Sequence, residues 1–388
     1  MIDNNLFCHG AVLLANGHVF TAGGDTYADI MRTPAATGLQ DGIKWMRDYD
    51  PATNTWGKIG DMNMARWYPT IVRLVDGRVL MIGGAVDGTV YAQQYIMEVW
   101  LPGRAINDQI PLNVLAETGT ALYPQCTLIP HTGNVFMFTY SKWAIIDKVS
   151  LKEIEREQEI TMGIRGGEFT AGAVLLPMTY SDNYKGEFIM FGGGAQFEQP
   201  WTAIDTVARI VLTTDGPKHW TYDTERIPYE RVVANVVIQP NGKLLIMNGG
   251  RLGKTGAPAI GQPNTKAETM HVFCYDPLKP DGQRWSVMAE SPIRRLYHSS
   301  GVLVPDGRTL IMGTDEASFL PRDAYEHRVE AFTLPWLLDG TPRPVITDIQ
   351  SGIIAYNSVF SVSFTGKVTG VAIITPSAST HGVEFLKE

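Results

Sequence analysis

The chain has 388 residues and a formal net charge of −8; 44% of its residues are hydrophobic and 19% are charged. This composition excludes a long disordered chain, and the absence of a basic stripe argues against a nucleic-acid partner. No apolar run reaches the roughly 18 residues that would predict a membrane-spanning helix, and three cysteines are too few for a disulfide framework.

A repeated unit organises the sequence between residues 10 and 313. Each copy has a short apolar strand, a turn with Gly, a second apolar strand and a group of small residues, which indicates an all-β architecture. The six copies are, in chain order, GAVLLANGHVFTAGG (10–24), TIVRLVDGRVLMIGG (70–84), CTLIPHTGNVFMFTY (126–140), AGAVLLPMTYSDNYKGEFIMFGGG (171–194), ANVVIQPNGKLLIMNGG (234–250) and SSGVLVPDGRTLIMG (299–313).

The turns and the segments between copies indicate what the repeat builds. Four turns contain Asn-Gly or Asp-Gly, at 16–17, 76–77, 241–242 and 306–307, and these pairs favour tight β-hairpins because they tolerate positive φ. Double glycines followed by spaced Tyr and Trp residues are typical of kelch repeats. Because a kelch ring often has seven blades, we expect a seven-bladed β-propeller that is incomplete in this chain or is completed by another segment.

The pattern changes near Pro335, where Pro342 and Pro344 follow Leu337-Leu338-Asp339-Gly340 in what resembles a linker. Beyond it, VITDI, SVFSVSF and GVAIITP alternate like the strands of a small sandwich. We therefore predict a propeller domain over residues 1–338 and a partial immunoglobulin-like β-sandwich over residues 339–388. That second domain is short for a self-contained sandwich, so we expect it to be truncated.

Three residues share a position in the repeat. Cys8 lies nine residues before Gly17, Tyr68 nine before Gly77, and Tyr297 ten before Gly307. Each begins the first strand of its blade, and first strands line the axis of a propeller, so we expect a thiol and two phenols to converge at one end of the hub. His298 adds an imidazole. Each residue alone is usually structural; their joint placement favours a functional site.

The segments FCHG (7–10), ARWYPT (65–70), RRLYHSSG (294–301) and STHG (379–382) resemble the active-site segments of the copper radical oxidases, the glyoxal oxidase and galactose oxidase family. The order and intervals also agree, and TLPWLLDGTPRPVI (333–346) looks like that family's passage from propeller to C-terminal sandwich. The resemblance covers nearly the whole chain and implies a galactose oxidase-like propeller with a copper site at its hub.

The resemblance assigns a role to each matching residue. It implies that Cys8 and Tyr68 are joined by a thioether bond and hold a radical, and that Tyr68, Tyr297, His298 and His381 bind one copper ion. Two imidazole nitrogens with oxygen donors also suit Cu(II) on chemical grounds. The substrate would lose a proton to Tyr297 and a hydrogen atom to the Cys8–Tyr68 radical, with O2 leaving as hydrogen peroxide.

The sequence departs from the family pattern in places that bear on the substrate and on the extent of the chain. Galactose oxidases carry a stacking Trp shortly after the cross-linked Tyr, and GGAVDGT (83–89) has none. Trp67 beside Tyr68 gives the RWYP form associated with glyoxal oxidase-like members, so we expect a small aldehyde or primary alcohol as substrate. Family members have a further blade before Cys8 and a secretion signal, so we expect this chain to be N-terminally incomplete.

Two other functions remain open on the sequence. One is a non-enzymatic kelch propeller that binds protein; the other is an inactive relative that binds glycans through exposed aromatics such as Trp100, Trp143 and Trp201. For the oxidase, the family implies an extracellular location, and we expect a monomer that binds neither nucleic acid nor membrane and whose product is removed by a peroxide-consuming enzyme.

Overall fold

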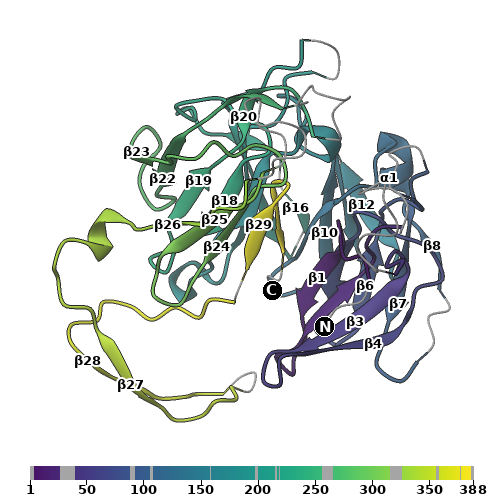
Figure 1. The fold of residues 1–388 in the computed structure, drawn as a ribbon, viewed down its shortest axis with the longest axis horizontal. Coiled ribbons are helices and arrows are strands. Elements are labelled where there is room, and N and C mark those ends of the chain that lie inside the picture. Colours follow the sequence, from purple (N-terminus) through teal and green to yellow (C-terminus); the bar gives the residue numbers. More distant parts are fainter. Residues whose placement is uncertain are drawn as a thin grey trace.

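The computed structural model describes residues 4–26, 40–87, 92–104, 108–157, 159–196, 200–214, 216–217, 219–255, 265–314, 326–354, 358–375 and 377–385. These residues form antiparallel sheets arranged around a common centre, which is a β-propeller (Figure 1). The described residues contain one α-helix, α1 (Asn113–Thr118), and short 3-10 turns, and none of these is long and apolar enough to cross a membrane.

The first three blades are four-stranded sheets in which consecutive strands pair. The strands are β1 (Gly10–Leu13), β2 (Val19–Ala22), β3 (Trp45–Asp50) and β4 (Thr55–Asp61) in blade 1; β5 (Thr70–Arg73), β6 (Val79–Ile82), β7 (Ile96–Trp100) and β8 (Ile110–Pro111) in blade 2; and β9 (Gln125–Leu128), β10 (Val135–Thr139), β11 (Lys142–Ile146) and β12 (Glu153–Glu157) in blade 3.

Blades 4 to 6 vary this plan. Their strands are β13 (Gly172–Leu175), β14 (Gly186–Phe191), β15 (Val207–Thr213), β16 (Gly216–Pro217) and β17 (Thr221–Tyr222) in blade 4; β18 (Asn235–Ile238), β19 (Leu244–Met247), β22 (His271–Tyr275) and β23 (Trp285–Glu290) in blade 5; and β24 (Ser300–Leu303), β25 (Thr309–Met312), β26 (Glu330–Phe332), β29 (Ala378–Thr380) and β30 (Val383–Phe385) in blade 6. A small pair, β20 (Gly250–Leu252) and β21 (Lys266–Glu268), accompanies blade 5.

The predicted hairpins are confirmed, with a common local structure. In blade 1, the Gly17 N–H donates to the Leu14 carbonyl (2.9 Å) and the Leu14 N–H to the His18 carbonyl (2.8 Å). Gly17 has a φ of 83°, and Asn16 Oδ1 accepts from the His18 N–H at 3.1 Å. A turn closed by a residue in the left-handed region explains why Asn-Gly and Asp-Gly occur at these places.

The double glycines allow neighbouring blades to approach closely. A Cβ atom on Gly23 would lie 2.3 Å from the carbonyl oxygen of Arg66 in the next blade, so any larger residue would push the blades apart. The same turns are held by buried arginines that donate to their carbonyl groups: Arg47 to Gly23, Arg66 to Gly83, Arg165 to Gly192, Arg231 to Asn248 and Arg295 to Gly313.

Apolar side chains fill the interfaces between consecutive blades from 1 to 6, which is where the core of the molecule lies. Phe20 and Met81 belong to the cluster between blades 1 and 2, and Ile189 and Val236 to the one between blades 4 and 5. Three of the four residues are buried in each of the inner strands β5, β9, β13 and β18, as expected for strands covered on both faces.

The described residues form six blades, so the prediction of seven is not met in this part of the chain. The two strands β29 and β30 lie in the hub: β29 pairs with β24 of blade 6 and contacts β18 of blade 5, and β30 contacts β13 of blade 4 and β1 of blade 1. In Figure 1 this hairpin, in yellow, stands at the centre of the molecule beside β1. A C-terminal segment therefore enters the ring rather than forming another blade.

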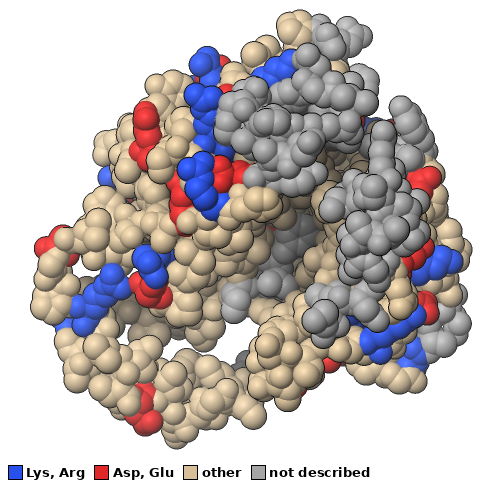
Figure 2. Space-filling view, viewed as in Figure 1, with Lys and Arg blue, Asp and Glu red and all other residues tan. Residues whose placement is uncertain are grey.

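The segment between blade 6 and this hairpin extends away from the body of the ring, as Figures 1 and 2 show. It contains β27 (Val345–Ile349) and β28 (Val362–Thr365), which pair only with each other. The side chains of Val345, Ile346 and Ile349 are about half exposed or more. The described part of this segment thus has two strands without a buried core; the immunoglobulin-like sandwich and the boundary after residue 338 stay predictions.

Candidate metal centre at the propeller hub

The hub site is built from one backbone position that recurs in the blades. Cys8, Tyr68 and His298 each lie two residues before the inner strand of blades 1, 2 and 6, with φ values of 59°, 59° and 60°. The left-handed conformation is uncommon for residues with a side chain and concentrates at functional sites. Because the position and the backbone angle are shared, the three side chains point toward the same region. Tyr297, one residue earlier than His298, is also buried there.

His381 reaches this region from the hairpin β29–β30, where it forms the turn with a φ of 55°. The hairpin is anchored from three blades. The Asn235 side chain donates to the carbonyl of Ser379 (2.9 Å), the Ala173 N–H donates to the carbonyl of Gly382 (3.1 Å), and the Ser300 hydroxyl donates to the Ser379 carbonyl (3.1 Å). The imidazole is therefore carried into the hub on a fixed strand pair.

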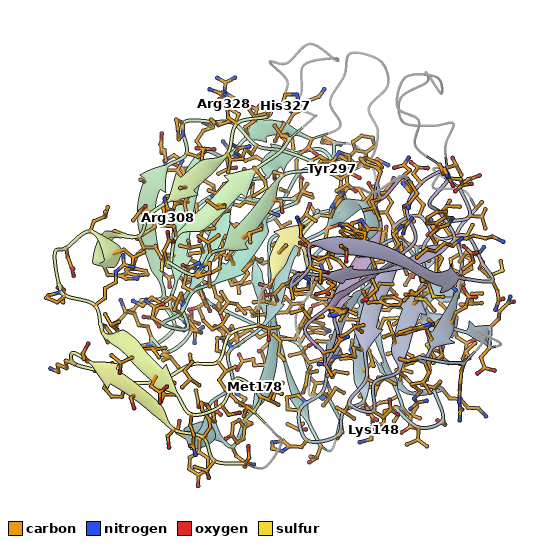
Figure 3. All side chains as sticks on the ribbon, turned by 60° about the horizontal axis from the view of Figure 1, so that its bottom comes forward. Lys148, Met178, Tyr297, Arg308, His327 and Arg328 are labelled. Atoms are coloured by element: carbon orange, nitrogen blue, oxygen red, sulfur yellow. The ribbon has the colours of Figure 1, made fainter. Side chains whose placement is uncertain are left out.

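The structure brings all five predicted residues together. The phenol oxygen of Tyr68 lies 3.3 Å from Nε2 of His298 and 3.4 Å from Nε2 of His381. The hydroxyl groups of Tyr68 and Tyr297 are hydrogen-bonded to each other, and Figure 3 shows Tyr297 toward one end of the propeller, with Lys148 and Met178 at the other. Two phenol oxygens and two imidazole nitrogens thus converge on one point.

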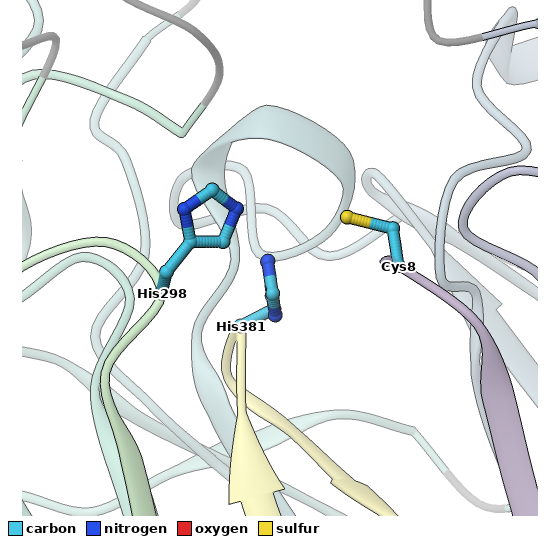
Figure 4. A group of neighbouring side chains, drawn as sticks. All are labelled: Cys8, His298 and His381. Atoms are coloured by element: carbon cyan, nitrogen blue, oxygen red, sulfur yellow. The ribbon is translucent and has the colours of Figure 1, made fainter. Parts of the chain in front are cut away.

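Cys8 completes the group. Its Sγ atom and one nitrogen each of His298 and His381 all lie within 4.8 Å of one another. Figure 4 shows the three side chains directed toward a common space from the segment before β1, the segment before β24 and the tip of the β29–β30 hairpin. Cys8 and Tyr68 also belong to the same buried cluster, and the Tyr68 N–H donates to the Cys8 carbonyl at 2.8 Å.

Burial favours the uncharged forms of Tyr68 and His381 when no ion is bound. Burial raises the pKa of Tyr68 well above its usual 10, and the nearby Cys8 and Tyr297 raise it further. Burial also lowers the pKa of His381 well below its usual 6.5, with His298 acting in the same direction. Neutral imidazole is the form that binds metals, so His381 is ready to act as a ligand without losing a proton.

A hydrogen-bond chain sets which nitrogen of His381 carries its proton. The Thr380 hydroxyl donates to the carbonyl of Ser299 (3.0 Å), so its oxygen is left to accept from Nδ1 of His381, 3.0 Å away. The proton therefore sits on Nδ1, and the Nε2 lone pair is directed at Tyr68 and His298. Partners of this kind orient metal-binding histidines and fix their tautomer.

The spacing of the donor atoms fits a transition-metal ion. Imidazole nitrogens bind such ions at about 2.0–2.1 Å, so two donors at right angles to each other are about 3 Å apart. The separations of 3.3 and 3.4 Å from the Tyr68 oxygen to the two histidines are close to this value. Imidazole and phenol donors in this number favour Cu(II) over Mg²⁺ or Ca²⁺, which take oxygen ligands.

A cavity of about 640 Å³ opens beside the site. Cys8, His298 and His381 are among its lining residues. The rest of the wall comes mainly from blade 1 and from the segment around Gly313 in blade 6, and it is largely apolar. A mostly apolar cavity with a few convergent polar groups is the usual form of a small-molecule site.

Two residues of the site were not singled out from the sequence. Thr380 is adjacent to His381, and nothing in the sequence alone indicates its hydrogen bonds. Tyr123 lies two residues before β9 and packs edge-on against Tyr68, with ring centroids 4.5 Å apart. Its spacing of ten residues before Gly133 matches that of Tyr297 before Gly307, so aligning the third repeat could have found it. In contrast, Trp143, suggested as an exposed glycan-binding residue, is buried in the core.

Comparison with known proteins agrees with this geometry. The family described as glyoxal oxidase N-terminus matches residues 1–336. "Aldehyde oxidase GLOX" from Vitis pseudoreticulata is 28% identical, with 93% of this chain and 66% of that protein covered. A "WSC domain-containing protein" from Arthroderma benhamiae is 29% identical over 99% of this chain and 41% of its own length. A "Galactose oxidase" from Gibberella zeae is 22% identical over 98% of this chain and 53% of its own.

Among solved structures, a "novel fungal alcohol oxidase with catalytic diversity among the AA5 family, in complex with copper" superimposes with a TM-score of 0.75 at 16% identity. The match covers all of this chain and 76% of that one, and it supports the propeller fold. The chain spans about two fifths to two thirds of the length of the relatives named above. The family match extends over most of the sequence, and the chain belongs to the glyoxal oxidase N-terminus family.

Proposed function

We propose that this protein is a copper radical oxidase that converts a small aldehyde or primary alcohol, with O2, to the acid or aldehyde and hydrogen peroxide. The observation that carries the proposal is the convergence of two phenols, two imidazoles and a thiol at one end of the hub. The relatives named as aldehyde and galactose oxidases, and the structural neighbour that holds copper, support the same chemistry.

Each hub residue has a distinct role in this proposal. Tyr68, Tyr297, His298 and His381 hold one copper ion, and Cys8 forms a thioether with the Tyr68 ring. The thioether forms when the Cys8 S–H and one ring C–H of Tyr68 are lost and a C–S bond is made; the two electrons and two protons reduce O2 to H2O2. The cross-linked pair then holds the radical, because sulfur on the ring makes the phenol easier to oxidise.

The oxidation of substrate removes two electrons, and the residues divide the work. Tyr297 accepts the proton of the substrate hydroxyl as general base, and the Tyr68–Cys8 radical removes a hydrogen atom from the carbinol carbon. Bound copper supplies the second one-electron oxidising equivalent and a Lewis-acid position for the substrate oxygen. The balance is R–CH2OH plus O2 to R–CHO plus H2O2; a hydrated aldehyde gives the acid in the same way.

The cavity and the surface support a small, uncharged substrate. The cavity wall is largely apolar, and the face in Figure 2 shows acidic and basic residues interspersed, without a broad area of one sign on its described part. We propose that residues 339–388 belong to an immunoglobulin-like sandwich, with the domain boundary after residue 338. We also propose an extracellular, monomeric enzyme whose peroxide is consumed by a second enzyme.

The first test is intact mass and a tryptic map after the purified protein is incubated with copper and air. We expect a loss of two hydrogens and a joined Cys8–Tyr68 peptide that persists under reducing conditions. The variant Cys8→Ser should keep its original mass and lose nearly all peroxide production with aldehyde substrates. Separate, unmodified peptides in a folded, copper-loaded protein would favour a binding propeller instead.

A further inference from the structure

Tyr123 is a third tyrosine of the hub, and no step of the proposed reaction uses it. It lies before the inner strand of blade 3 and is 7% exposed. Its ring meets the Tyr68 ring edge-on, at 4.5 Å between centroids and 87° between planes, and lies 5.2 Å from the His381 ring. Tyr123 therefore touches two residues of the candidate centre from a blade that contributes no proposed ligand.

Hydrogen bonds connect Tyr123 to the segments of both residues that the thioether would join. The Tyr123 N–H donates to the Tyr68 carbonyl (2.9 Å), and the Tyr68 N–H donates to the Cys8 carbonyl (2.8 Å). The Tyr123 hydroxyl returns to blade 1 and donates to the carbonyl of His9 (2.9 Å). These three hydrogen bonds connect blades 1, 2 and 3 to one another at the hub. Two of them are between backbone groups, and the third depends on the Tyr123 side chain.

These hydrogen bonds help to hold three residues in an unfavourable backbone conformation. Cys8, Tyr68 and Tyr123 all have positive φ, at 59°, 59° and 44°, a conformation that costs energy and persists only where the surroundings hold it.

We infer that Tyr123 is a positioning residue for the Cys8–Tyr68 cross-link: its hydroxyl holds the Cys8 segment, and its ring holds the ring of Tyr68. This inference rests on the proposed function, because it assumes that the thioether forms. Carbon–sulfur bond formation requires the sulfur and the ring carbon to be held close together, and small displacements reduce such rates strongly. Tyr123 does not itself gain or lose an electron or a proton.

The test uses the rate at which the 388-residue chain loses two hydrogens after copper is added in air. Tyr123→Phe keeps the ring and removes the bond to the His9 carbonyl. We expect its cross-linking rate to fall about fivefold, the effect of losing one neutral hydrogen bond, while its affinity for copper stays at the wild-type value. Copper affinity separates the proposed role from general loosening of the hub, which would lower both quantities.

Two further variants make the result decisive. Tyr95→Phe is the matched control. The Tyr95 hydroxyl also donates to a backbone carbonyl, that of Gly119 at 3.3 Å, but Tyr95 lies outside the buried cluster that contains Cys8, Tyr68 and Tyr123. This variant should cross-link at the wild-type rate. If Tyr123→Phe does not fold, 4-methylphenylalanine at position 123 fills the same volume without a donor and should show the same slow rate. Equal cross-linking rates in the wild type and in the folded position-123 variant would overturn the inference about Tyr123 and leave the proposed function intact. A wild-type protein that never loses two hydrogens would overturn the proposed function, and the inference with it.

Discussion

The histidine at the tip of the C-terminal hairpin shows how one neighbouring side chain prepares a ligand atom. His381 has two ring nitrogens, and only an unprotonated one can bind a metal. Thr380 donates its single hydroxyl proton to the Ser299 carbonyl, so it can only accept from Nδ1 of His381. Nε2 is thereby left unprotonated on the side of Tyr68, 3.4 Å from its oxygen.

Replacing Thr380 with valine should therefore weaken copper binding. Valine has nearly the same shape, but it provides no acceptor for Nδ1–H, and the imidazole is then free to rotate or to change its tautomer. We expect Thr380→Val to lower copper affinity by about 10- to 100-fold, the usual effect of losing such a partner. Competition against a chelator of known affinity measures it. Thr380→Ser keeps the hydroxyl and should bind copper nearly as the wild type does; a serine variant as weak as the valine variant would contradict the tautomer argument.

At the scale of the elements, five of the six blades have a buried arginine that donates to the carbonyl of the turn after their second strand. Arg66 is completely buried, donates to the carbonyls of Gly83 and Ile96, and contacts Glu98, its Nε lying 3.0 Å from a carboxylate oxygen. Glu98 in turn accepts from the backbone of Asn63 at 2.9 Å. The arginine neutralises a carboxylate that is itself 0% exposed and that orders the loop before Tyr68.

Arg66→Met should consequently destabilise the protein far more than a surface arginine substitution. It leaves a buried carboxylate without a counter-charge, which costs about 3–5 kcal/mol in the free energy of unfolding. Arg308, paired with Asp306 in the hairpin of blade 6, is 46% exposed and serves as the comparison; Arg308→Met should cost less than about 1 kcal/mol. Urea unfolding followed by tryptophan fluorescence measures the free energy of unfolding of both variants. Equal losses of stability would show that the buried Arg66–Glu98 pair stabilises the protein no more than an exposed ion pair does.

The elements also show which parts of the fold were predictable. The hairpins and the inner strands follow local rules, so the turns at 16–17, 76–77, 241–242 and 306–307 predicted them correctly. The spacing of Cys8 and Tyr68 from the glycines of their hairpins is also a local feature, and it correctly predicted that the two side chains meet at one end of the hub. The structure refines one alignment: His298, rather than Tyr297, is equivalent to Cys8 and Tyr68, since all three lie two residues before a strand and share a φ near 60°.

Long-range pairing was beyond the reach of the sequence pattern. Nothing local in STHG (379–382) indicates that residues 378–380 pair with β24, roughly 80 positions earlier. The expectation of seven blades came from the usual size of kelch rings rather than from the number of repeats, and the six copies in the sequence correspond to the six blades of the described chain. The bond from Tyr123 to the His9 carbonyl is equally long-range, since it joins residues 114 positions apart.

At the scale of the whole molecule, the hairpin β29–β30 is both a ligand carrier and part of the ring. Its residues accept hydrogen bonds from blades 4, 5 and 6, and β30 also contacts β1. Gly382 fits because a Cβ there would lie 2.4 Å from the carbonyl of Ala171. The metal site and the closure of the ring are thereby coupled, since the same ten or so residues serve both.

Two variants separate these contributions. Deleting residues 377–388 removes the bonds from Asn235, Val236 and Ala173 to the hairpin as well as the pairing with β24, so we expect the free energy of unfolding of the metal-free protein to fall by at least about 3 kcal/mol, about 1 kcal/mol for each lost bond. His381→Ala keeps the hairpin and should leave the free energy of unfolding of the metal-free protein nearly unchanged.

The response to copper is the second comparison. Copper at 100 times its Kd should stabilise the wild type by about 2.7 kcal/mol, and it should stabilise neither of the two variants. Thermal unfolding of the three proteins with and without copper measures these differences. A deletion variant as stable as the 388-residue chain would mean that the ring closes without its C-terminal hairpin.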